Sequence, residues 1–146
     1  MTSLTNSLKD EATMTQAVKD CCSLIDGEVV KKSGLSGMAI KAGFKSVKGI
    51  KPGFIEKVVH DLLPEFAKAL DPIQQEAIQK GEPVPAYFEA HASRVADALL
   101  AITDQKAERS SNKVVKGAYG KLRGMAKSNV EAAVPGLAAL TIKHSR

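Results

Sequence analysis

Residues suited to binding an anion occur together at a predicted helix start. The run Lys32-Ser33-Gly34-Leu35-Ser36-Gly37 supplies a lysine, hydroxyl groups and flexible backbone. Free N–H groups and the helix dipole at such a start favour a phosphate or a carboxylate. The run lacks the GxxxxGK[ST] spacing of the phosphate loop, and it follows a predicted helix instead of a strand. It therefore indicates anion binding in general and no particular nucleotide.

Lysine and arginine are concentrated in two stretches that contain no acid. Residues 29–55 and 109–130 hold 12 of the 21 basic residues and none of the 16 acids, although the whole chain has a net charge of +5. This segregation predicts an anionic partner, or attraction between two parts of the protein. Each stretch is predicted to form an amphipathic helix with a basic strip beside an apolar arc. The candidate anion-binding residues are Lys32, Ser33, Gly34, Ser36, Gly37, Lys41, Lys45, Lys48, Lys113, Lys116, Arg123 and Lys127.

Glycines lie within or beside the basic strip of the second stretch. Gly117, Gly120 and Gly124 occupy positions where glycine costs ~1 kcal/mol relative to alanine in a helix. Either another helix backbone or an anionic ligand is expected to approach closely along this line, and these three are the candidate close-packing glycines. Ordinary helix packing with solvated lysines is the competing interpretation.

Enzymatic chemistry is weakly indicated. Glu56 and His60 are four residues apart on one predicted helix face, a spacing that metal sites use. A single pair of this kind is more simply explained as a solvated helix surface. We find no GxSxG motif and no dinucleotide-binding fingerprint, so no catalytic residue, metal or cofactor is predicted. Phe44 and Tyr119 are the aromatic residues of the basic helices, and both are expected to be buried, which argues against base stacking.

Composition and periodicity predict an all-α domain of about six to eight helices. Apolar residues make up 44% of the chain, aromatic residues only 4%, and Trp is absent, so the core must consist of Ala, Leu, Val and Ile. We expect a kink or break at Pro64, a helix start at Asp71-Pro72 and a linker at 82–85. The expected helices are 15–31, 35–50, a third with its core face over 55–70, 72–81, 86–108, 113–129 and 130–142, the last containing Pro135.

The domain organisation is predicted to be simple. Residues 1–13 form a polar lead-in, residues 14–142 form one helical domain, and the tail from Lys143 is expected to be loose. Residues 41–50 align without gaps onto residues 116–125. An internal duplication is therefore expected, with units 14–81 and 86–142 related by an approximate two-fold axis.

Cysteine usage and hydropathy predict a cytoplasmic protein. Cys21 and Cys22 are adjacent, and neighbouring helical residues point about 100° apart, so a bridge between them would distort the backbone. Reduced, packed thiols are expected instead. We find no secretory signal, and no apolar run approaches the ~20 residues of a membrane span.

Three runs of sequence also resemble a known family. SGLSGMAIKAGFKSVKGIKPGF, LLPEFAKALDP and VADALLAITD are similar to a small bacterial all-helical domain family of unknown function. The resemblance implies no reaction or ligand, so function must be inferred from the residues. They favour a non-enzymatic module for helix-mediated interaction or self-association, for example as a homodimer. The alternative is a binder of anionic ligands, such as nucleic-acid phosphates or lipid head groups at a membrane surface, through the two glycine-containing basic helices.

Overall fold

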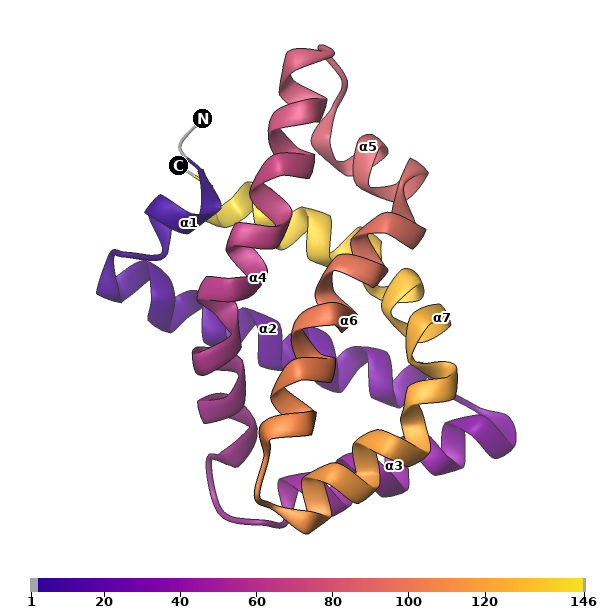
Figure 1. The fold of residues 1–146 in the computed structure, drawn as a ribbon. Coiled ribbons are helices and arrows are strands. Elements are labelled where there is room, and N and C mark those ends of the chain that lie inside the picture. Colours follow the sequence, from indigo (N-terminus) through magenta and orange to yellow (C-terminus); the bar gives the residue numbers. More distant parts are fainter. Residues whose placement is uncertain (1–2, 146) are drawn as a thin grey trace.

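The computed structural model describes residues 3–145, and this part of the chain consists of helices joined by short turns and loops, with no strand (Figure 1). The predicted all-α class is confirmed. The helices are α1 (Leu4–Ser7), α2 (Glu11–Lys31), α3 (Gly34–Lys48), α4 (Phe54–Gln79), α5 (Val84–Ala90), α6 (Ala92–Arg109) and α7 (Lys113–His144).

The helices pack around one core. In Figure 1, α4 and α6 run side by side, α2 crosses them, and α7 contacts both α2 and α6. The most deeply buried side chains come mainly from the facing surfaces of α4, α5, α6 and α7. They include Ala67, Leu70, Ile73, Phe88, Val95, Val134 and Ala138. The core is therefore aliphatic, as the composition requires.

Two helices continue through prolines where breaks were expected. The predicted helix start at Asp71-Pro72 is wrong, because α4 is one helix of 26 residues containing Pro64 and Pro72. Likewise, the predicted helices 113–129 and 130–142 are one helix of 32 residues with Pro135 inside it. All three prolines are exposed, while apolar residues on the opposite face are buried. Packing therefore stabilises the helix on both sides of each proline, which has no backbone N–H to donate. Helix α7 also bends in its second half (Figure 1).

The N-terminal lead-in is folded onto the core. Its short helix α1 carries two buried side chains, Leu4 and Leu8. The carboxylate of Asp71 in α4 accepts hydrogen bonds from the backbone N–H of Leu4 (2.9 Å) and of Thr5 (3.3 Å), and from the Thr5 hydroxyl. Ser3 is the N-cap of α1, and Asp71 accepts from the next N–H groups of this helix and does not start a helix of its own. Residues 1 and 2 lie outside the described part of the chain.

The expected loose tail is ordered as far as the structure describes it. His144 is the last residue of α7 and is buried, and its Nε2 lies 2.8 Å from Oδ2 of Asp20 in α2. Lys143 Nζ donates to the same oxygen, also at 2.8 Å. This pairing holds the pKa of Asp20 low, at about 2, chiefly through the hydrogen bond from Lys143. Arg146 lies outside the described residues.

The expected helix over 86–108 is divided in two. It separates into α5 and α6 at His91, whose φ of −114° and ψ of 33° are not helical. The predicted linker is shorter than expected, because α5 begins at Val84. The internal duplication stays a prediction.

Candidate functional site

The two basic stretches form neighbouring helices. Helix α3 and the first half of α7 pack against each other and run in opposite directions (Figure 1). Their contact is close at Gly43, where an added Cβ would lie 2.8 Å from Cδ1 of Leu122. Two segments about 75 residues apart in the sequence thus lie side by side in the fold.

Four of the candidate anion-binding residues already form ion pairs with acidic side chains of the same chain. Their partners lie on α2 and α6, at distances between 2.7 and 4.0 Å. Lys32 pairs within the end of α2, and the other three pairs join α3 or α7 to a neighbouring helix, so the charge of all four is partly neutralised within the chain. The pairs are Lys32–Glu28, Lys48–Asp26, Arg123–Asp104 and Lys127–Asp97.

A second set of lysines is exposed and has no acid of the described chain within ion-pair distance. We call this set the basic face. It consists of two residues of α3 and three of α7, and the segments that carry them contain no acid. A cluster of uncompensated positive charge attracts anions. The members of the basic face are Lys41, Lys45, Lys113, Lys116 and Lys121.

The predicted anion-binding run at the start of α3 has an acid beside it. Ser33 occupies the N-cap position, but its side chain makes no capping hydrogen bond. Gly34 has a φ of +72°, which a glycine adopts readily, and an added Cβ at Gly37 would lie 2.7 Å from the carbonyl carbon of Lys32. Ser36 is exposed. Because the Glu28 carboxylate already pairs with Lys32, the basic face is better suited to an anion than this run is.

Apolar side chains are exposed where α2 meets α3. Val30, Leu35 and Met38 have relative exposures of 74%, 87% and 68%. We call these three residues the apolar corner. Met38 lies three and seven residues before Lys41 and Lys45 on the same helix, so they share one exposed side of α3. On α3, the exposed apolar residues Leu35 and Met38 are therefore continuous with the two lysines of the basic face.

The exposed side of α7 carries the three glycines that the sequence singled out. Gly117, Gly120 and Gly124 are exposed, and a Cβ added to any of them would meet no neighbouring atom of the chain within 4 Å. Close approach within the chain occurs instead at Gly37, Gly43 and Gly136. The predicted close packing at the α7 glycines thus requires a partner outside this chain.

The two aromatic residues of the basic helices are half-buried. The Tyr119 hydroxyl hydrogen-bonds to Asp104, at 2.5 Å, and to Thr103. Lys48 Nζ lies 5.3 Å from the centre of the Phe44 ring. Both rings thus have intramolecular partners, which leaves little surface on which a base could stack.

Glu56 and His60 form no metal site with other residues. Both side chains are exposed, and His60 Nδ1 lies 3.7 Å from its neighbour Asp61. Among residues 3–145, no three His, Cys, Asp or Glu side chains are grouped so as to hold a metal ion. Their exposure fits the simpler interpretation of a solvated helix surface.

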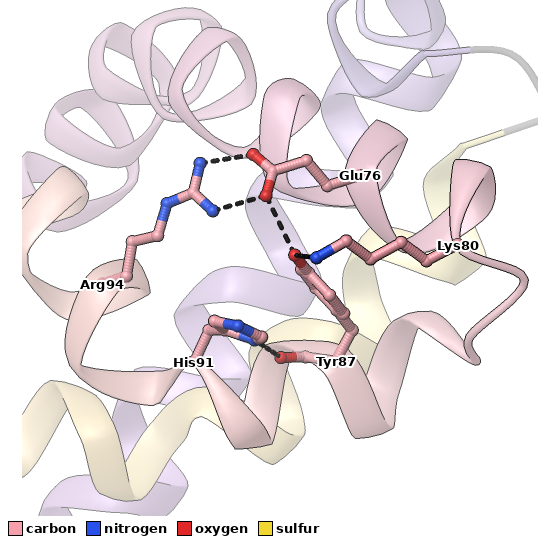
Figure 2. A network of polar contacts seen from close by, with 5 residues as sticks. All are labelled: Glu76, Lys80, Tyr87, His91 and Arg94. Carbon is pink, nitrogen blue, oxygen red and sulfur yellow. Dashed lines mark hydrogen bonds and ion pairs between the residues drawn. The ribbon is translucent and has the colours of Figure 1, made fainter.

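A polar network joins the end of α4 to α5 and α6 (Figure 2). Arg94 donates to both carboxylate oxygens of Glu76, at 2.7 and 2.5 Å, and the Tyr87 hydroxyl donates to the same carboxylate at 2.9 Å. His91 stacks on Tyr87 with ring centres 4.2 Å apart. The Arg94 hydrogen bonds hold the pKa of Glu76 low, at about 2. The Glu76 carboxylate of α4 thus binds side chains of both α5 and α6, so the network fastens three helices together.

An apolar pocket of about 330 Å³ lies between α2, α4, α6 and α7, with α1 and Phe44 of α3 completing its wall. Sequence reasoning missed it because no local motif marks it. Its walls come from six helices, each of which looks like an ordinary amphipathic helix by itself. The lining positions along α4 extend from Ile55 to Leu70.

A family model for a family of unknown function, DUF6918, matches residues 4–145. The chain belongs to this family. The match confirms the resemblance to a helical family of unknown function. Membership in DUF6918 brings no assigned activity, and neither the search of curated proteins nor that of solved structures gave a match. Within residues 3–145, no helix of this DUF6918 chain is long and apolar enough to cross a membrane.

Proposed function

We propose that this DUF6918 chain is a non-enzymatic binding protein that docks onto an anionic membrane surface through its basic face and apolar corner. The observation that carries the proposal is their continuity along α3. Leu35 and Met38 are exposed at its start, and Lys41 and Lys45 follow on the same side. An interfacial helix binds through this combination of inserted apolar side chains and cations near lipid head groups.

Electrostatic attraction supplies one part of the binding free energy. A lysine near an anionic lipid surface contributes about 1 kcal/mol, and Lys41 and Lys45, on the same side of α3 as Met38, have no acidic partner among the described residues. The apolar corner supplies the other part. Full burial of a Val, Leu or Met side chain contributes about 1.5–3 kcal/mol. The two parts together support reversible attachment, and neither requires a membrane-spanning helix.

A membrane fits this surface better than a nucleic acid does. Nucleic-acid phosphates would attract the lysines, but Phe44 and Tyr119 are both engaged within the chain and offer little surface for stacking. The exposed apolar side chains of the apolar corner would also remain in water on such a complex. A lipid surface accommodates both the charge and the apolar groups.

Vesicle co-sedimentation tests the proposal. We expect the chain to bind phosphatidylcholine vesicles that contain phosphatidylserine and to bind pure phosphatidylcholine weakly. The double variant Lys41→Gln/Lys45→Gln should weaken binding about 30-fold, because two lysines contribute about 2 kcal/mol. Its matched control is Lys19→Gln/Lys68→Gln, which makes the same charge change at exposed lysines of α2 and α4.

The apolar contribution needs its own variant. Leu35→Ser/Met38→Ser should weaken binding to anionic vesicles while leaving the dependence on salt unchanged. Equal affinity for neutral and anionic vesicles would refute the proposal, as would an equal loss in the control pair. Salt-sensitive binding to duplex DNA without any binding to vesicles would favour the nucleic-acid alternative.

A second candidate function is helix-mediated association through α7. The open space over Gly117, Gly120 and Gly124 favours it, because a helix could pack closely there. Two copies meeting through this basic helix would bring like charges together, so an acidic helix is a better partner than a second chain. Light scattering at micromolar concentration tests self-association, and a monomeric mass would rule out a stable homodimer.

A further inference from the structure

The walls of the apolar pocket offer almost nothing to a polar ligand. Three polar side chains reach it, and each already has a partner. Thr103 Oγ1 donates to the Leu100 carbonyl at 3.1 Å, and Thr141 Oγ1 donates to the Leu137 carbonyl at 2.9 Å. His144 Nε2 lies 2.8 Å from the Asp20 carboxylate. The pocket surface is otherwise hydrocarbon, apart from the Cys21 sulfur.

Cys21 adds no charge to this surface. Burial raises the pKa of its thiol to about 11, so the sulfur stays neutral at physiological pH. At about 30 Å³ per molecule, the pocket volume corresponds to roughly ten waters, which would find few hydrogen-bond partners on these walls. An apolar occupant is therefore favoured over water.

The shape of the pocket restricts what that occupant is. Lining residues follow α4 from Ile55 to Leu70, which is roughly 22 Å at 1.5 Å per residue. A volume of about 330 Å³ spread over this length makes a narrow slot. A linear hydrocarbon chain fits such a slot, whereas a bulky ring system needs a wider one.

A second hollow, lined by several polar residues, shares one wall residue with the apolar pocket. This hollow has a volume of about 450 Å³ and is lined by side chains of α1, α2 and the C-terminus of α7. It includes Asn6, Gln16 and Lys143, and it shares His144 with the apolar pocket. His144 thus borders an apolar pocket and a hollow with polar lining residues, an arrangement that matches the two ends of an amphiphile.

We propose that the apolar pocket binds one single-chain amphiphile, with its hydrocarbon chain along α4 and its polar head toward the hollow at His144. This site is separate from the basic face and does not rest on membrane docking. A free fatty acid and a lysophospholipid share the required chemistry. The probes of the test distinguish between them.

Binding of palmitate, hexadecanol and lysophosphatidylcholine is measured by native mass spectrometry and calorimetry on the full chain. We expect one molecule bound per chain for at least one probe. Ala67 has no exposed surface and lines the pocket, so Ala67→Leu places additional carbon atoms in the slot. This variant should bind at least ten-fold more weakly. The matched control is Ala101→Leu, at an exposed position of α6, which should bind like the wild type.

A second variant and a second readout keep the test decisive if Ala67→Leu does not fold. Ala17→Leu fills the slot from α2, and its effect should be the same. In a Cys22→Ser background, palmitate or the best-binding probe should slow the reaction of Cys21 with a thiol reagent. Failure of all three probes to bind would overturn the proposal. So would unchanged affinity in a folded filling variant, or an unchanged rate at Cys21 under saturating probe.

Discussion

Replacement of Asp71 by alanine should loosen α1 from the core. Asp71 lies inside α4 and accepts hydrogen bonds from the Leu4 and Thr5 N–H groups at 2.9 and 3.3 Å, and from the Thr5 hydroxyl. A hydrogen bond to a charged group contributes about 1.5–3 kcal/mol. If α1 detaches completely, Leu4 and Leu8 also lose their burial, and each contributes about 1.5–3 kcal/mol. We therefore expect Asp71→Ala to lower the free energy of unfolding by at least about 1 kcal/mol and by several kcal/mol if α1 detaches.

Urea denaturation measures this loss, and amide hydrogen exchange at Leu4 and Thr5 locates it. Asp71→Asn retains one acceptor oxygen and should cost less. Asp61→Ala is the matched control on the same helix, because Asp61 is half exposed and pairs only with the nearby Lys57 and His60. Such an exposed pair contributes about 0.3–0.5 kcal/mol. An Asp71→Ala variant that is no less stable than Asp61→Ala would refute the role of Asp71 in holding α1.

Gly120→Ala should raise the free energy of unfolding of the isolated chain by about 0.5–1 kcal/mol, because the site is exposed, helical and open around the added Cβ. A decrease in a urea melt would show that the space is needed within the chain. The second prediction concerns acid pH. Glu76 has a pKa of about 2 in the folded chain against 4.5 ordinarily, so its stabilisation is complete above about pH 4.5 and declines as the pH falls toward 2. In urea melts at a series of pH values, Arg94→Ala should make the free energy of unfolding depend less on pH in this range. The same dependence in the variant and the wild type between pH 5 and 2 would contradict this prediction.

The sequence by itself determined the helical class and the two basic helices. Both depend on residues close together in the chain, namely the periodic spacing of apolar positions and the absence of acids around Lys41 and Lys116. The helix boundary at Ser33 was also marked locally, by the following glycine. Local free energies are large enough to fix such features, so they could be predicted.

Tertiary packing decided which lysines remain free. Arg123 pairs with an acid 19 residues away and Lys127 with one 30 residues away, whereas Lys113 and Lys116 face solvent. A helical wheel places all four on one strip and cannot separate them. The pairing depends on where α6 lies, which only the packed structure defines.

Packing also overrode the strongest local signals in the chain. Asp71-Pro72 has the composition of a helix start, yet α4 continues because Leu70 and Ile73 are buried on either side of the proline ring. The Asp71 carboxylate instead accepts a hydrogen bond from the backbone of α1, 66 residues earlier in the sequence. The apolar pocket has the same origin. Each of its walls is an ordinary amphipathic helix, and the empty volume arises only from how six helices meet.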